Sequence, residues 1–181
     1  MPNCNQEAAH RAASDAELIA WVDAADQLLG SLPRAELRAR GLVGRGTFIL
    51  LFNSVGELCV HQRTFSKALY PGYWDVAAGG MVLATESYAE SAARELAEEL
   101  GITDVALREH GRFYFEQPDN RLWCGVFSAV SDAPLRLQAE EVLQARFVPI
   151  EAALADAAVQ PYCPDSLVAL KRYLALNKQA R

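Results

Sequence analysis

The stretch from Ser87 to Gly101 carries both ends of a helix in its sequence. Ser87 followed three residues later by Glu90 is a capping box, in which each side chain satisfies a backbone amide of the first turn. Gly101 is the residue type that most readily adopts the left-handed conformation that ends a helix. Small and apolar side chains recur between these ends at intervals of three and four, at Ala89, Ala92, Ala93, Leu96 and Leu100. This spacing predicts one amphipathic helix that docks on a sheet.

Strand-like and helix-like segments alternate through the rest of the chain. Residues 47–53 form an almost continuous apolar run, which is typical of a strand buried on both faces. The β-prone run and polar turn within 17–32 predict a hairpin, although the alanine content there also permits a helix. Other strands are expected at 58–63, 105–116, 121–130 and 142–148, and other helices at 33–40, 151–158 and 164–176, the last capped by Asp165 or Ser166. The alternation predicts an α/β protein with helices layered on a mixed sheet.

Length and composition limit the class of protein. The 181 residues suit one domain, expected at 16–181, and the polar segment 1–15 reads as a flexible tail without the apolar core of a secretion signal. Hydrophobic residues make up 51% of the chain, too many for full disorder, and no run approaches the roughly 18 residues of a membrane span. The net charge of −6 argues against a nucleic-acid backbone as the main partner. Four cysteines without a CxxC pair indicate reduced thiols in a cytoplasmic protein.

Three glutamates share one face of the predicted helix, apart from its small apolar stripe. Glu95, Glu98 and Glu99 are spaced at i, i+3 and i+4, so their side chains repel one another. They also lie in the last turns, where the helix dipole disfavours negative charge. A divalent cation such as Mg²⁺ would relieve both effects, because it prefers carboxylate oxygen and keeps waters for a substrate phosphate. In isolation the trio also fits a simpler interpretation, in which good helix formers face solvent.

The whole segment 80–102 resolves that choice, because it matches the Nudix box. Every fixed position of that motif is present: Gly80, Glu86, Arg94, Glu95, Leu96, Glu98, Glu99, Gly101 and Ile102. From average residue usage, the coincidence of these types is expected about once in 10⁸ placements. The chain therefore resembles the Nudix hydrolases. The resemblance implies a Nudix α/β/α sandwich with a central mixed sheet.

The resemblance also implies an activity and roles for the matching residues. Nudix proteins typically hydrolyse a nucleoside diphosphate linked to another moiety, with Mg²⁺ or Mn²⁺. Glu95 and Glu99 would be metal ligands, and Glu98 would bind metal or help to activate water. Arg94 would pair with a box carboxylate, Glu86 first, and so orient the glutamates. Gly80 would let the backbone pass close to the metal. A homodimer is plausible for the family, and no DNA-binding module or membrane segment is expected.

Residues outside the motif complete the expected site. Many family members use a further glutamate as base or ligand, and Glu140 and Glu141 are the candidates here, with a solvated loop as the alternative. Arg63 and Lys67 flank the loop before the motif and are candidates to clamp the diphosphate as cations. Exposed loop cations without a role remain the alternative for this pair. Cys124 and His61 lie on strand patterns, where packing is the expected role.

Within the family, the chain looks most like the isopentenyl-diphosphate isomerase-like branch. Two stretches outside the motif resemble that branch: GELCVHQRTFSKALYPGYWD at 56–75 and LPRAELRARGLVGRGTFILLFN at 32–53. An N-terminal β-hairpin extension before Pro33 also fits that branch. The cysteine that the isomerase reaction needs has no counterpart after Trp74, and no histidine metal ligands are evident, since His10 lies in the predicted tail. The resemblance therefore favours a hydrolase. The alternatives are isomerase-type activity and a non-catalytic nucleotide-binding regulator.

Overall fold

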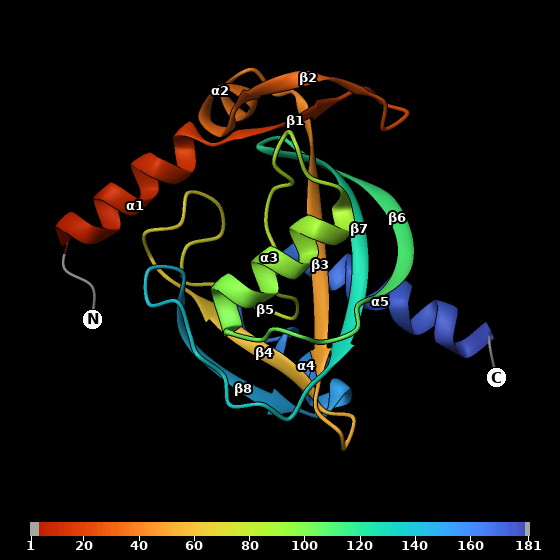
Figure 1. Cartoon of the computed structure of the whole chain (residues 1–181). Coiled ribbons are helices and arrows are strands. Elements are labelled where there is room, and N and C mark those ends of the chain that lie inside the picture. The colour runs from red at the N-terminus through yellow and green to blue at the C-terminus, as the bar shows by residue number, and fades with distance from the viewer. Residues whose placement is uncertain (1–3, 180–181) are drawn as a thin grey trace.

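The computed structural model describes residues 4–179. One eight-stranded sheet runs through the molecule, and its main path is β2-β1-β3-β4-β5. The strands are β1 (Leu18–Val22), β2 (Leu28–Pro33), β3 (Val43–Phe52), β4 (Leu58–Arg63), β5 (Trp74–Asp75), β6 (Arg108–Gln117), β7 (Asn120–Val130) and β8 (Val142–Val148). The helices are α1 (Cys4–Ala16), α2 (Arg34–Ala39), α3 (Tyr88–Leu100), α4 (Ile150–Asp156) and α5 (Pro164–Gln179). Figure 1 shows β3 at the centre of this arrangement.

The sheet is mixed, as predicted. Strand β3 pairs in parallel with β7 over nine residue pairs and antiparallel with β1 and β4. Strand β6 pairs with β7, and β8 pairs with β4, both antiparallel. Because packed layers cover both faces of the sheet at β3, its apolar run 47–52 is buried. The strand predicted from that run is confirmed, and it begins a few residues earlier than expected.

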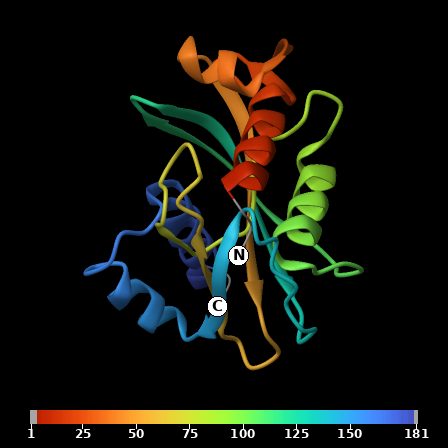
Figure 2. The ribbon, with the colours of Figure 1, turned by 90° about the vertical axis from the view of Figure 1, so that its left-hand side faces the viewer.

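Helices cover both faces of the sheet. In Figure 2, α3 lies on one side of the strands and α4 and α5 lie on the other. Successive side chains of a strand point to opposite faces, so Leu50 packs in the cluster beneath α4 and α5, whereas Ile49 and Leu51 pack beneath α3. The predicted α/β/α sandwich is therefore present. Among the described residues, no helix combines the length and the apolar character needed to cross a membrane.

The N-terminal hairpin is present as predicted, since β1 and β2 pair antiparallel. Its turn is held to the rest of the fold by Asp26. The Asp26 carboxylate accepts hydrogen bonds from Arg45 Nε at 2.6 Å, Arg112 Nη1 at 3.0 Å and Tyr88 Oη at 3.0 Å. Helix α2 begins directly after Pro33 and ends at Ala39, and Gly41 follows with a φ of 61°. The hairpin and α2 thus sit above the start of α3 as one attached unit (Figure 1).

The prediction of a tail at 1–15 is wrong for its helical part, because α1 occupies Cys4–Ala16. Three bonds from distant residues hold this helix against the fold. Arg34 Nη1 donates to Ser14 Oγ at 2.7 Å, Arg38 pairs with Asp15 at 3.1 Å, and His10 Nε2 lies 2.8 Å from Glu141 Oε1. The polar composition that suggested a loose tail instead supplies these long-range contacts.

Helix α3 has the predicted ends but a different buried face. Ser87 and Glu90 form the capping box, and Gly101 ends the helix with a φ of 69°. Ala89 and Ala93 are exposed, so the predicted stripe is wrong at these two positions. The buried residues are Tyr88, Ser91, Ala92, Glu95, Leu96, Glu99 and Leu100. Two of the glutamates predicted to lie apart from the docking face therefore belong to it.

Candidate active site

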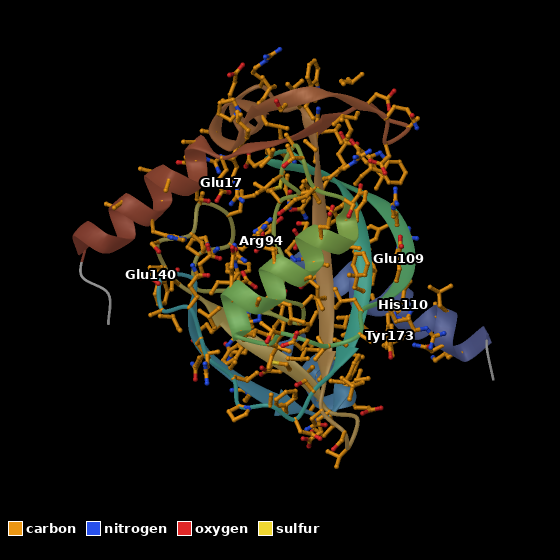
Figure 3. All side chains as sticks on the ribbon, viewed as in Figure 1. Glu17, Arg94, Glu109, His110, Glu140 and Tyr173 are labelled. Atoms are coloured by element: carbon orange, nitrogen blue, oxygen red, sulfur yellow. The ribbon has the colours of Figure 1, made fainter. Side chains whose placement is uncertain are left out.

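A cavity opens beside α3 and is lined in part by α1. Its walls come from α1, α2, the loop between β4 and β5, α3, the loop before β8 and the first residues of β7 and α5. In Figure 3, Glu17, Arg94 and Glu140 lie on this side of the molecule, whereas Glu109 and His110 lie on the far side. Of the residues predicted to act in catalysis, substrate binding or metal binding, all but Glu99 line the cavity. Glu99 bonds to Gly79, which does line it. Glu86, the predicted partner of Arg94, does not line it.

The backbone before α3 passes close to one of the glutamates. Thr47 N donates to the Gly80 carbonyl at 2.9 Å, and Ile49 N donates to Ala78 O at 2.7 Å, so this segment runs along β3. A Cβ atom at Gly80 would lie 2.4 Å from Glu95 Oε1. The Gly80 backbone therefore passes close to the Glu95 carboxylate, and its predicted approach to a metal ion stays a prediction.

Two carboxylates on the inner face of α3 are almost fully buried. Glu95 is 6% exposed and Glu99 is 2% exposed. Burial raises the pKa of Glu95 to about 7. Burial and then the neighbouring Glu141 carboxylate raise the pKa of Glu99 well above its usual range. Glu99 Oε2 accepts a hydrogen bond from Gly79 N at 3.0 Å. The site therefore concentrates carboxylates where water cannot stabilise their charge.

Arg94 connects three of the motif's glutamates. Its Nε and Nη2 atoms donate to the two oxygens of Glu86 at 2.7 and 3.0 Å. Its Nη1 atom donates to Glu95 at 2.8 Å and to Glu98 at 3.0 Å. The predicted pair with Glu86 is thus present and bidentate, a geometry that fixes the guanidinium plane. The Glu98 side chain is 50% exposed, so it differs from Glu95 and Glu99 in environment.

Glu141 faces the same site from the loop before β8. Lys67 Nζ and His10 Nε2 both bond to its carboxylate. Burial opposes ionisation of Glu141, but the Lys67 ammonium outweighs it and lowers the pKa of that carboxyl. Glu140 lines the cavity beside it, and its carbonyl accepts a bond from Thr64 Oγ1 at 2.9 Å. His10 is the neighbour that the sequence did not predict, because 131 residues separate it from Glu141.

These carboxylates suit a hard divalent cation. Glu95 and Glu99 are buried, and Mg²⁺ and similar ions prefer carboxylate oxygen. Across the part of the chain that the structure describes, no three His, Cys, Asp or Glu side chains converge as a finished set of metal ligands. Arg94 and Lys67 instead bond to the carboxylate oxygens. A cation that binds here would compete with these bonds for the oxygens that they occupy.

A second polar group lines the inner end of the cavity, and Arg63 belongs to it. The Arg63 side chain is only 16% exposed, and its Nη1 atom lies 3.7 Å from Asp75 Oδ2, so it is not the exposed loop cation considered from the sequence. Asp75, Asn120 and Asp165 are each buried. Asn120 Nδ2 donates to Asp165 Oδ2 at 2.8 Å and to Tyr70 Oη at 3.3 Å. These residues come from β4, β5, β7, α5 and a loop, so no local motif could reveal them.

The buried carboxylate of Asp165 predicts a pH dependence of stability. Burial, and then the nearby Asp75, raise the pKa of Asp165 from 3.8 to about 6, against opposing effects of Asn120, Ser166 and Arg63. The native state thus binds the proton more tightly than the unfolded state, and this residue's contribution to stability falls as pH rises from about 4 to about 6. Asp165→Asn removes that titration.

We therefore expect the unfolding free energy of Asp165→Asn, relative to that of the unmodified chain, to rise by about 2–3 kcal/mol between pH 4 and pH 6.5. Urea denaturation at matched pH values measures this difference. A difference that stays constant over that interval would show that Asp165 does not titrate as described.

Cys124 and His61 lie in the interior, where packing was expected. Cys124 is 0% exposed within the cluster beneath α4 and α5, and His61 is 2% exposed on β4. Burial raises the pKa of the Cys124 thiol above its usual range and lowers the pKa of His61 to about 4. Neither side chain lines the cavity.

Comparison with known proteins connects this geometry to one family. The model of the NUDIX domain matches residues 43–164. The chain is 76% identical over 166 residues to an uncharacterized Nudix hydrolase of Pseudomonas aeruginosa, covering 92% of this chain and 98% of that protein. It is 39% identical over 160 residues to the uncharacterized Nudix hydrolase YfcD of Escherichia coli K12, covering 87% and 88% of the two chains.

Solved structures show the same fold. DR0079 from Deinococcus radiodurans superposes with a TM-score of 0.74 at 26% identity, covering 87% of this chain and 99% of that one. A MutT protein from Methanosarcina mazei Go1 superposes with a TM-score of 0.64 at 27% identity, covering 75% and 96%.

Proposed function

Since the chain belongs to the Nudix hydrolase family, we propose that it hydrolyses the diphosphate linkage of a small molecule, such as a nucleoside diphosphate derivative, with Mg²⁺ or Mn²⁺. One observation carries this proposal. Glu95 and Glu99 are buried on the inner face of α3 while Glu141 faces them from another element, beside the cations Arg94 and Lys67. A fold gains no stability from buried like charges, so the arrangement favours a role in binding a cation and its anionic ligand.

Each residue of the site has its own role in this proposed reaction. Glu95 and Glu99, with Glu98 at the solvent side, would hold a divalent cation, which neutralises diphosphate charge and makes water easier to deprotonate. Lys67 and Arg63, which line the cavity, would present positive charge to the phosphates. Glu141 stays ionised next to Lys67 and is the candidate to accept the proton of the attacking water. Arg94 holds Glu86 and Glu95 in place, which makes it a positioning residue.

Isomerase-type activity, from the isopentenyl-diphosphate isomerase-like branch, is the alternative that shares this scaffold. The backbone between Trp74 and Gly80 carries no cysteine. A regulator that binds without turnover is the other alternative, and the complete set of motif glutamates disfavours it. The three functions differ in their products, so one assay separates them.

The test incubates the purified chain with nucleoside diphosphate derivatives, sugar diphosphates and isopentenyl diphosphate, each with Mg²⁺, Mn²⁺ or EDTA. We expect cleavage between the two phosphorus atoms of at least one compound, read by chromatography, and its loss in EDTA. Glu109→Gln, on the far side of the molecule (Figure 3), serves as the control and should cleave normally. Isomerisation without hydrolysis, or tight binding without any product, would overturn the proposal.

A further inference from the structure

Helix α1 is attached to the molecule by polar contacts, and one of these contacts reaches the candidate active site. We propose that His10 on α1 is a positioning residue, which holds the Glu141 carboxylate in place while the substrate is bound. The inference rests on the proposed function, since Glu141 is the group that would accept the proton of the attacking water. His10 itself would neither give nor take a proton in the reaction.

The face that α1 turns toward the fold is polar. Its partly buried side chains at 8–16 are His10, Ser14 and Asp15, whereas its alanines there are exposed. A surface helix ordinarily gains stability by burying an apolar stripe. Of the described side chains at 8–16, none belongs to the hydrophobic cluster on either face of the sheet. The three polar side chains instead line the cavity, which favours a role for α1 at the site.

The hydrogen bond between His10 and Glu141 holds one oxygen of the carboxylate. The two atoms, His10 Nε2 and Glu141 Oε1, lie 2.8 Å apart. Against the effect of burial, Lys67 and then His10 lower the pKa of Glu141, so the carboxylate is ionised and can only accept hydrogen bonds. His10 Nε2 must therefore carry the hydrogen of this bond, in the neutral ring as in the charged one. His10 acts as a donor that orients Glu141.

Lys67 holds the other oxygen of Glu141, but it is also a candidate partner of the substrate. Lys67 Nζ donates to Glu141 Oε2, and its ammonium would turn toward the phosphates of a bound diphosphate. Glu99, which also influences the ionisation of Glu141, would bind the cation. Among the described residues, His10 is then the donor that remains on the Glu141 side chain. Departure of Lys67 frees Oε2 for the proton of the water, while His10 keeps Oε1 in place.

The backbone of Glu141 does not orient the carboxylate by itself. Glu141 N donates to Gln138 O at 2.9 Å, and Glu141 O accepts from Thr64 N at 3.0 Å. These bonds fix where the side chain begins, but its χ angles can still change between staggered positions. A misplacement of about 1 Å at a reacting centre can cost about a hundredfold in rate. Loss of the bond on Oε1 should therefore be measurable in turnover.

The test compares two replacements of His10 that differ in the donor. Glutamine brings an amide nitrogen close to the position of Nε2, whereas leucine has no donor, and both are good helix formers. With a compound that the unmodified chain hydrolyses, we expect His10→Leu to lower kcat about 10- to 100-fold and to leave KM within about twofold. His10→Gln should keep kcat within about threefold of normal. Ala9→Leu, at an exposed position of the same helix, is the matched control and should turn over normally.

A double-mutant cycle shows whether His10 acts through Glu141. In a chain that already carries Glu141→Gln, we expect His10→Leu to lower kcat by less than about twofold, because no base remains to be positioned. Circular dichroism checks that each variant folds. An unchanged kcat in His10→Leu would overturn the inference, even though the chain hydrolyses its substrate. The same loss with and without Glu141→Gln would overturn it as well.

A second readout does not depend on turnover. Nuclear magnetic resonance of the chain labelled with ¹⁵N-histidine follows the Nε2 atom of His10, whose signal is identified by its absence in His10→Gln. We expect this signal to move in Glu141→Gln, because an amide oxygen accepts a weaker bond than a carboxylate. An unmoved signal would overturn the inference whether or not the chain hydrolyses diphosphates. A moved signal in a chain that cleaves nothing would support the holding of Glu141 by His10 while contradicting the proposed hydrolysis.

Discussion

Glu99→Gln is expected to leave the fold intact and to slow diphosphate hydrolysis on the order of a thousandfold, since a bound metal ion supplies several kcal/mol of transition-state stabilisation. Glutamine keeps the volume of the side chain, and its carbonyl oxygen can still accept the bond from Gly79 N. The variant loses the negative charge of the Glu99 carboxylate, whose ionisation burial disfavours. Turnover at saturating Mg²⁺, with circular dichroism to check folding, measures the effect.

Glu98→Gln provides the comparison on the same helix. Its side chain is 50% exposed and bonded to Arg94, so its predicted contribution to metal binding or water activation is tested separately from that of Glu99. Glu109→Gln controls for the loss of a surface charge. If Glu98→Gln and Glu99→Gln both hydrolysed substrate at the normal rate, the assignment of these glutamates as metal ligands would be wrong.

Gly79→Ala is expected to prevent folding or to destabilise the chain by more than about 4 kcal/mol, the range of exceptional single substitutions. Gly79 has a φ of 153°, which side chains rarely adopt. A Cβ atom there would lie 1.9 Å from the Thr47 carbonyl oxygen, and Thr47 belongs to the central strand. Relief of that clash would separate the segment that bonds to Glu99 from β3. Urea denaturation of the purified variant measures the loss.

Gly56→Ala is the control for this prediction, because Gly56 also has a positive φ, of 86°, but nothing lies within 4 Å of the added Cβ. It should cost only the strain of the backbone conformation, about 1–2 kcal/mol. Similar losses in the two variants would mean that the close approach to β3 is not what requires glycine at Gly79.

Local features of the fold were predictable because their signals are local. The ends of α3 follow from Ser87, Glu90 and Gly101, whose side chains or backbone conformations act within one turn. The buried strand β3 follows from its apolar run. The pair of Arg94 and Glu86 followed from the family resemblance, and the structure contains it. Each of these depends on neighbours along the chain or on a fixed motif.

The features that sequence reasoning missed depend on distant neighbours. The face of α3 that docks on the sheet includes Glu95 and Glu99. Sequence periodicity could not predict this, because it assigns only apolar residues to the buried side of a helix. Polar residues that break this rule are expected at functional sites. The alanines of helix α1 at 8–16 are exposed, and polar partners such as Glu141 and Arg34 hold the helix. Asp75 and Asp165 come together only because β5 ends and α5 begins at the same cavity.

The central claim is that the buried glutamates of α3 bind a divalent cation. Titration of Mn²⁺ followed by electron paramagnetic resonance tests it without reference to any substrate. We predict that the unmodified chain and Glu109→Gln bind Mn²⁺ equally, and that Glu99→Gln binds it at least about tenfold more weakly, as expected when a charged ligand is lost. Equal binding of Mn²⁺ by the unmodified chain and by Glu99→Gln would contradict the claim.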